Sequence, residues 1–328
     1  TGAASSTDCL VAIVMTGGRG RGSRVTGWAS ALPDNIVTNH DLAKTLDTSH
    51  EWIVERTGIH TRHIGGTTHG LSVESGQAAI TSAGLTADDI DMVVLATTTP
   101  DKQCPATAST VQDALGIRGG AFDIQAACSG FVYGLAVADG MIATGAEHVL
   151  VIGTDTLSNI TDWTDRGTAI LFADGSGAMV VSATDGPGNI LACSLGSDGS
   201  LEKLLYAEHH GGNLVMNGRE VFRKAVTVMV GTSNDAMAKA GVTIDDISLV
   251  VPHQANIRII EVACKRLRVP MDMVAVCLDH TGNTSSASIP LAFVEAEAAG
   301  RIQPGELVLM TGFGAGMSSA SAVLRWGP

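Results

Sequence analysis

The sequence predicts an α/β protein made of two similar halves, with helices covering mixed β-sheets. The first observation is an ungapped internal match between residues 83–94 (AGLTADDIDMVV) and residues 240–251 (AGVTIDDISLVV). The second is that apolar strand patterns alternate with helical patterns after each copy, which is typical of sheets covered by helices. The third is a helical segment in each half that is apolar on nearly every side, since such a helix is buried.

Composition and charge favour a globular enzyme over a nucleic-acid-binding or membrane protein. The 328 residues carry a net charge of −13 and only 4% aromatic residues, whereas nucleic-acid surfaces need cations and stacking rings. No apolar run approaches the roughly 20 residues of a membrane-spanning helix, so we expect no membrane insertion and a cytoplasmic location. The six cysteines form no motif that indicates a disulfide framework or a metal site.

Three regions are expected along the chain. Residues 1–22 combine an apolar run with a Gly/Arg-rich stretch, so we predict an N-terminal extension outside the fold, with Met15 as a candidate natural start. Residues 23–185 form the N-terminal half and residues 186–328 the C-terminal half. The acidic pairs just before the first strand of each copy, such as Asp88 and Asp89, are expected only to solvate a helix end or a turn.

The elements of the first half begin with a strand near Arg24, a turn at residues 32–35 and a helix capped by Thr38 or Asn39. After each copy of the repeat we expect a strand that runs into the buried helix, then an apolar strand, then a closing strand with alternating polarity. These three segments are residues 122–145, 149–154 and 169–182 in the first half, and 274–300, 307–314 and 319–326 in the second.

Cys128 lies where the strand that starts at Phe122 passes into the buried helix. Unpaired N–H groups and the helix dipole favour a thiolate at a helix N-terminus, which is how a fold activates a nucleophile. A single cysteine is more often a core residue. Whether Cys128 is a nucleophile therefore depends on which residues lie near it.

Two polar residues of the second half are expected beside Cys128. His253 ends a strand at the edge where open α/β sheets place their ligands. Asn283 lies in the turn at residues 280–284, which the repeat pairs with the Cys128 turn across a pseudo-two-fold axis. Each residue alone would more often be an ordinary histidine or a turn asparagine, but together the three predict one site.

Four motifs in this order, ACSGF around Cys128, PHQAN around His253, GNTSSAS around Asn283 and GFGAG at residues 312–316, resemble the 3-oxoacyl-[acyl-carrier-protein] synthase III family of thiolase-fold condensing enzymes. The resemblance covers residues 24–326. It implies a thiolase-like fold with α-β-α-β-α layers, and an acyltransferase that starts fatty-acid synthesis. The implied reaction is a decarboxylating Claisen condensation of an acyl-CoA with malonyl-acyl carrier protein, which needs no cofactor and no metal.

The resemblance also implies roles for single residues. Cys128 would carry the acyl group, while His253 and Asn283 would donate hydrogen bonds to the enolate oxygen. The N–H of Cys128 and an N–H of the turn with Ala315 and Gly316 would form a second oxyanion hole. The residues implied for CoA and its pantetheine arm are Thr48, Trp52, Arg56, Arg166, Gly218, Phe222 and Asn256.

Partners follow from the same resemblance. The carrier protein is acidic, so a basic patch is required on this acidic chain. All candidate residues for this patch are expected near the mouth of the tunnel that the resemblance implies for the pantetheine arm. They are Arg219, Arg223, Lys224, Arg258, Lys265, Arg266 and Arg268. A homodimer is expected, in which Cys104 closes the far end of the partner's acyl pocket in place of a phenylalanine.

Other functions remain open at this stage. Similar residues serve priming synthases and acyltransferases of polyketide pathways on the same fold. The order Cys, His, Asn also occurs in papain-like peptidases, but the apolar helix after Cys128 and the duplicated α/β pattern disfavour that class. A non-catalytic scaffold subunit would be expected to lack the nucleophile.

Overall fold

The computed structural model describes residues 21–208 and 211–327. Strand β1 (Arg21–Ala31) begins at Arg21 and pairs with β7 (Asp174–Asp185) from its first residue. Residues 21 and 22 therefore belong to the first sheet, which corrects the predicted boundary of the extension. The predictions for residues 1–20, including Met15, lie outside the described residues.

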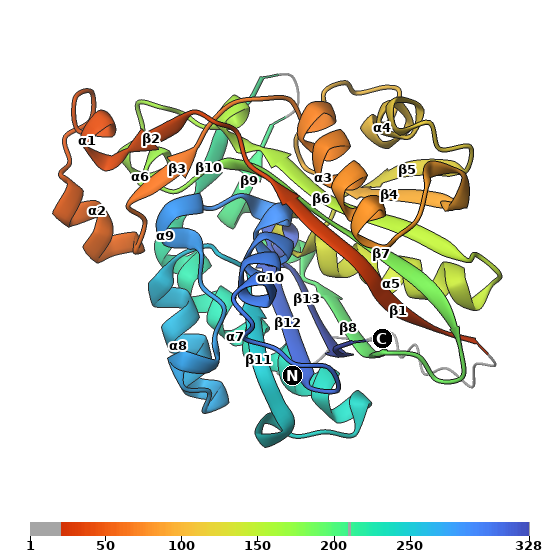
Figure 1. The fold of residues 1–328 in the computed structure, drawn as a ribbon. Coiled ribbons are helices and arrows are strands. Elements are labelled where there is room, and N and C mark those ends of the chain that lie inside the picture. The colour runs from red at the N-terminus through yellow and green to blue at the C-terminus, as the bar shows by residue number, and fades with distance from the viewer. Residues whose placement is uncertain (1–20, 209–210, 328) are drawn as a thin grey trace, which may run out of the picture.

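Two mixed sheets form the framework (Figure 1). The first has the order β1-β7-β6-β4-β5, with β6 (His148–Thr156), β4 (Met92–Ala96) and β5 (Gly120–Ile124). The second has the order β11-β12-β13-β8, with β11 (Ile247–Pro252), β12 (Leu307–Gly314), β13 (Ser318–Arg325) and β8 (Ile190–Ser197). Parallel pairs lie beside antiparallel ones in both sheets.

Helices fill the space outside and between the sheets. Helices α3 (Thr68–Ser82) and α4 (Thr107–Leu115) cover the first sheet, and α7 (Gly218–Ala240) and α8 (Ile257–Leu267) lie on the side of the second. Helices α5 (Gly130–Ala143) and α10 (Ser288–Ala298) lie between the sheets and contact both. The expected α-β-α-β-α layer order is confirmed.

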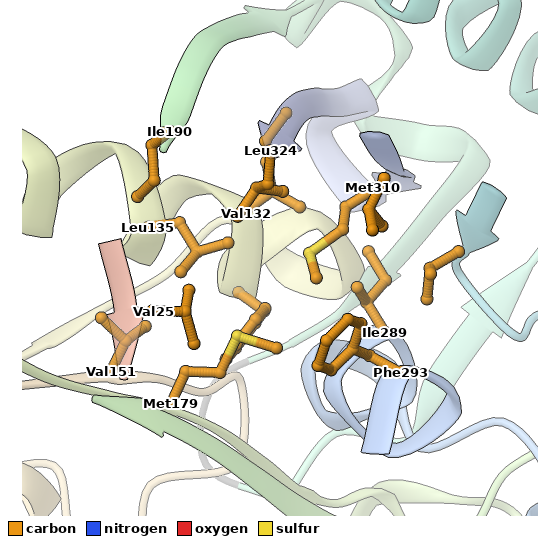
Figure 2. Close-up of a cluster of buried hydrophobic side chains, with 14 of the residues drawn as sticks. Val25, Val132, Leu135, Val151, Met179, Ile190, Ile289, Phe293, Met310 and Leu324 are labelled. Atoms are coloured by element: carbon orange, nitrogen blue, oxygen red, sulfur yellow. The ribbon is translucent and has the colours of Figure 1, made fainter. Parts of the chain in front are cut away.

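The central layer explains why α5 and α10 are apolar all round. Figure 2 shows Val132 and Leu135 of α5 and Phe293 of α10 among side chains from both sheets. All three are fully buried. Burial of each such side chain contributes about 1.5 to 3 kcal/mol, so this layer joins the two halves into one core.

Short elements complete the chain. They are β2 (Ile36–Thr38), α1 (Asn39–Leu42), α2 (His50–Thr57), β3 (Thr61–His63), α6 (Arg166–Ala169), β9 (Leu205–Ala207), β10 (Leu214–Met216) and α9 (Leu278–Thr281). Thr38 is the N-cap of α1, and its hydroxyl accepts the Asp41 N–H.

The internal repeat has a structural cause in a pair of matching turns. Thr86 and Asp89 form a capping box before β4, and Thr243 and Asp246 form the same box before β11. In each box the carboxylate accepts the threonine N–H and hydroxyl, which fixes the entry of the chain into the strand. Asp89 and Asp246 therefore shape these turns, beyond the simple solvation that the sequence suggested.

One expected element is missing from the second half. Residue Val274 forms only an isolated bridge with Val250, and the short helix α9 follows in place of a strand. The second sheet thus has four strands where the first has five.

Candidate active site

Cys128 lies in a 3-10 turn, Ala127–Ser129, that leads from β5 directly into α5. It is 8% exposed, and the Ser285 side chain hydrogen-bonds to its thiol. Burial raises the pKa of Cys128 to about 12, and the Ser285 contact opposes that rise only in part. The expectation that the helix N-terminus favours the thiolate is therefore outweighed by desolvation, and the resting group is the thiol.

The counterpart of the Cys128 turn in the second half is the 3-10 turn Ser285–Ala287, which leads into α10. Both turns open on a non-glycine residue with positive φ, 47° at Ala127 and 52° at Ser285. Such backbone is uncommon and needs support from its surroundings. Cys128 is thus matched by Ser286, which corrects the predicted match with residues 280–284.

Asp155, at the end of β6, connects these two turns to the first sheet. This carboxylate is fully buried. Its Oδ1 accepts from the Thr98 N–H at 2.7 Å, and its Oδ2 accepts from the Ser286 N–H at 3.0 Å and the Ser286 hydroxyl at 2.7 Å. A buried carboxylate with several donors is well compensated, so Asp155 fixes the second-half turn beside Cys128. A polar residue at a strand end is the one sequence signal for this role.

His253 follows β11 and is 1% exposed. Its Nδ1 lies 2.6 Å from the Ser288 hydroxyl, and its ring meets the Phe313 ring edge-on at 5.4 Å. Burial lowers the pKa of His253 to about 3. The imidazole is therefore neutral and offers a hydrogen bond to a substrate through one nitrogen only.

Asn283 is buried beside these groups, with backbone bonds to Leu171 and Ala173 that hold its chain against the first half. Its side-chain Oδ1 accepts the Ser285 N–H at 3.0 Å. That bond orients the amide, and the donor nitrogen Nδ2 takes no part in it. Ser285 thus contacts both Asn283 and the Cys128 thiol.

Strand β12 brings Cys128 and His253 together. A Cβ at Gly312 would lie 3.5 Å from the Cys128 carbonyl oxygen and 3.6 Å from the His253 Cβ. The turn with Ala315 and Gly316, which directly follows β12, borders the hollow at Cys128. The hydrogen bonds of the two turns run from Ser129 N to Ala126 O and from Ser318 N to Ala315 O. Neither bond uses the N–H of Cys128 or Ala315.

A hollow of about 680 Å³ opens beside Cys128. Its walls come from the first half, from the segment that carries β9 and β10, and from the turns at Ser285 and at Ala315. The apolar part of this wall, next to a nucleophile, suits an acyl chain. Its apolar and aromatic lining residues include Leu157, Ile160, Phe172, Leu205, Tyr206 and Leu214. Sequence reasoning missed all of them, because they lie on separate short elements without a shared motif.

The comparisons with known proteins agree with this geometry. The family model described as 3-oxoacyl-[acyl-carrier-protein (ACP)] synthase III matches residues 122–199, and its C-terminal counterpart matches residues 237–326. The β-ketoacyl-[acyl-carrier-protein] synthase III of Roseiflexus castenholzii is 49% identical, and the match covers 92% of this chain and 97% of the relative. The chain belongs to the 3-oxoacyl-[acyl-carrier-protein] synthase III family.

Solved structures show how far this synthase III chain resembles other members. The 3-oxoacyl-[acyl-carrier-protein] synthase III of Aquifex aeolicus is 44% identical with a TM-score of 0.91, and the match covers 93% of this chain and all of that one. A priming β-ketosynthase of the R1128 polyketide pathway is 36% identical with a TM-score of 0.89, over 95% and 98% of the two chains. The thiolase-like fold and the classification as an acyltransferase are thereby confirmed. No helix within residues 21–208 and 211–327 is long and apolar enough to cross a membrane.

Three of the residues that the resemblance implies for CoA come together from α2 and α6. The Arg166 guanidinium lies 4.8 Å from the centre of the Trp52 ring, and Arg56 lies 5.6 Å from it. Arg166 also donates to the Asp47 carbonyl at 2.7 Å. The neighbouring Thr48 hydroxyl is buried without a hydrogen-bond partner among the described residues.

The predicted pantetheine residues lie at the start of α7 and α8. Asn256 caps α8 by accepting the Arg258 N–H. Its Nδ2 donates to the Arg56 carbonyl at 3.0 Å, which joins α8 to α2. Gly218 is the first residue of α7, and one turn later Phe222 lies under the Arg258 guanidinium at 6.0 Å. None of the seven residues predicted to contact CoA lines the hollow of 680 Å³.

The predicted basic patch is divided between two places, which corrects the expectation of one cluster at the tunnel mouth. Arg219, Arg223, Lys224 and Arg258 lie in the first turns of α7 and α8. Lys265 and Arg266 lie in the last turn of α8, roughly 10 Å further along its axis at 1.5 Å per residue. Arg266 and Arg268 line a separate hollow with the C-terminal part of α7. Only Arg219, Arg223, Lys224 and Arg258, here called the mouth group, lie near Phe222.

Cys104 is exposed on this chain and does not line the hollow at Cys128. Its predicted role needs a partner subunit and stays a prediction.

Proposed function

We propose that this enzyme starts fatty-acid synthesis by joining an acyl group from acyl-CoA to malonyl-acyl carrier protein. The products are 3-oxoacyl carrier protein, CoA and CO2. The observation that carries the proposal is that Cys128 lines a hollow and has neutral His253 and Asn283 beside it, the first across Gly312 and the second through Ser285.

In the first step the Cys128 sulfur attacks the acyl-CoA thioester. The new C–S bond replaces the bond to CoA, and the thiol proton leaves with the CoA sulfur. The hydrogen bond from Ser285 stabilises negative charge on the Cys128 sulfur during the attack. The acyl chain then extends into the hollow, where each methylene that meets an apolar wall contributes about 0.8 kcal/mol.

In the second step the malonyl thioester loses CO2, and the electrons of the broken C–C bond form an enolate. His253 and Asn283 supply hydrogen-bond donors for the enolate oxygen, in a buried site where such donors have their largest effect. Because burial keeps the pKa of His253 near 3, the imidazole stabilises this charge as a neutral donor.

In the third step the enolate carbon attacks the acyl-Cys128 carbonyl. The N–H groups of Cys128 and the Ala315-Gly316 turn are the donors for the second oxyanion, and its collapse releases the Cys128 thiol after uptake of one proton. Gly314 permits the close approach of the two turns, since any Cβ there would overlap Cys128.

The carrier protein, a homodimer and a cytoplasmic location are parts of the same proposal. The mouth group provides positive charge for an acidic carrier, and β5 lies at the edge of the first sheet, where a second copy can pair. Priming of a polyketide pathway is the second candidate. The polyketide priming enzyme is 36% identical to this chain, whereas the Aquifex aeolicus synthase III is 44% identical.

The decisive experiment incubates the protein with a panel of acyl-CoAs and malonyl-acyl carrier protein, followed by mass spectrometry of the carrier. A 3-oxoacyl carrier supports the proposal. An acyl carrier without the 3-oxo group indicates simple acyl transfer, and free acid indicates hydrolysis. Either result would contradict condensation. The Cys128→Ala variant provides the background.

A further inference from the structure

The proposed role of His253 depends on which ring nitrogen carries its hydrogen. A neutral imidazole has one N–H, and the other nitrogen is an acceptor. Nδ1 is already engaged by Ser288, so only Nε2 is left for a substrate oxygen. An enolate oxygen needs a donor, so catalysis requires the Nε2–H tautomer.

Ser288 is the first residue of α10 and is 1% exposed. Its Oγ lies 2.6 Å from Nδ1 of His253 and accepts the Gln254 N–H at 3.3 Å. An oxygen that accepts a backbone N–H keeps its own hydrogen for another acceptor. Within residues 21–208 and 211–327, Nδ1 of His253 is the one acceptor that the structure places at the Ser288 hydroxyl.

Gln254 holds this arrangement in place through its own side chain. Its Nε2 donates to the carbonyls of Pro252 and Ala275, and its Oε1 accepts the N–H groups of Cys277 and Leu278. The fully buried amide thus uses both ends to tie the backbone before His253 to residues 275–278. These bonds help to hold the Gln254 N–H toward Ser288.

We infer that Ser288 is a positioning residue that donates its hydroxyl hydrogen to Nδ1 of His253 and so holds this histidine as the Nε2–H tautomer. The opposite tautomer would leave the Ser288 hydrogen without an acceptor and would direct a lone pair at the enolate oxygen. Both effects are unfavourable in a buried site. This inference rests on the proposed role of His253 in decarboxylation.

The test combines a direct measurement of the tautomer with the two half-reactions. Protein labelled with ¹⁵N at histidine gives imidazole shifts that distinguish a protonated from an unprotonated nitrogen, and His253 is assigned by the loss of its signals in His253→Ala. We compare the wild type with Ser288→Ala and Ser288→Thr. Ser75→Ala is the matched control, because it removes another fully buried hydroxyl, one bonded to Ser176 within the first half.

We expect Nε2–H in the wild type and in Ser75→Ala, and a shift toward Nδ1–H in Ser288→Ala. In Ser288→Ala, kcat for malonyl decarboxylation should fall about tenfold, while acylation of Cys128 changes by less than about twofold. Ser288→Thr, which keeps a hydroxyl, should restore the tautomer.

The inference is overturned by Nδ1–H in the wild type, by an unchanged tautomer in Ser288→Ala, or by equal loss of both half-reactions in that variant. If the tautomer responds as expected but the wild type decarboxylates no malonyl thioester, the control by Ser288 stands and the proposed function fails.

Discussion

The backbone of Gly314 lies so close to Cys128 that a Cβ at Gly314 would be 2.6 Å from the Cys128 nitrogen. Gly314 ends a strand of the second half, and Cys128 precedes the buried helix of the first. The nucleophile and the turn with Ala315 are therefore positioned by one contact between the halves. The predictions below concern the residues that this contact brings together and their approach to substrate.

The first prediction is that acyl-CoA acylates Cys128 and no other cysteine. Cys264 and Cys277 are buried, and desolvation raises their pKa as well, but neither lines the hollow of 680 Å³. Cys128 also has the Ser285 hydrogen bond. Peptide mapping by mass spectrometry after incubation with acyl-CoA should place the added mass on Cys128. Acyl mass elsewhere, or its persistence in Cys128→Ala, would contradict the assignment.

The second prediction separates the two half-reactions. His253→Ala and Asn283→Ala should each lower malonyl decarboxylation by about 10² to 10³, because each removes one donor to the enolate oxygen. Acylation of Cys128 should persist in both, since the thiol keeps Ser285. Radiolabelled CO2 release and intact-mass acylation measure the two steps separately. Equal loss of both steps would instead indicate a cysteine-histidine pair that acts in acylation.

The third prediction uses the division of the basic residues. Arg258→Glu should raise KM for malonyl-carrier protein because Arg258 belongs to the mouth group, and the effect should shrink as salt is added. Acylation by acyl-CoA should change little. Arg266→Glu is the matched control on the same helix, since Arg266 lies at its far end beside another hollow. Equal effects of the two variants would argue against a local docking site.

Sequence patterns predicted the layers, the capped helix at Thr38 and the residues Cys128, His253 and Asn283, because each depends on local chemistry or on a motif. They did not predict the roles of Asp155 and Ser285, although Ser285 stands inside a recognised motif. Those roles depend on contacts between the two halves, of Asp155 with Ser286 and of Ser285 with Cys128. The raised pKa of the Cys128 thiol was also not predicted, because desolvation is a property of the assembled core.

The basic residues do not form a single cluster, because those of α8 are spread along the length of the helix. Arg258 and Arg266 are eight positions apart, which is about 12 Å at 1.5 Å per residue. The sequence predicts that these side chains are cationic. Their positions along α8 decide which surface each of them lies on.

The fourth prediction concerns stability and pH. His280 bonds Asp279 at 3.0 Å and Glu295 at 2.9 Å, and these two hydrogen bonds raise its pKa to about 10. A raised pKa means that the contribution to stability is complete below the unfolded value of 6.5 and is lost as pH rises through about 10. The ring is about half exposed, so solvent limits this contribution to less than about 1 kcal/mol.

His280→Gln should therefore lower the unfolding free energy slightly at about pH 6 and leave it unchanged at about pH 10.5. Urea unfolding of both proteins at each pH measures the difference. His69→Gln is a suitable control because the His69 ring contacts the Thr110 hydroxyl in place of a carboxylate. A difference for His280→Gln that is the same at both pH values would exclude a charge effect.

The last prediction concerns acyl-chain length. The loop with Cys104 follows β4, and family resemblance places it at the far end of the partner's acyl pocket, with cysteine where members restricted to short primers carry phenylalanine. A thiol is much smaller than a benzyl group, so the pocket should accept butyryl or branched primers. Cys104→Phe should shift the preference toward acetyl-CoA, because a chain that meets a closed wall is excluded from a packed interior. The relevant measurement is kcat/KM for acetyl- to octanoyl-CoA in both proteins. Cys104→Ser is the size-matched control. An unchanged chain-length profile in Cys104→Phe would show that other residues, such as Leu205 or Leu214 in the walls of the hollow, set the limit.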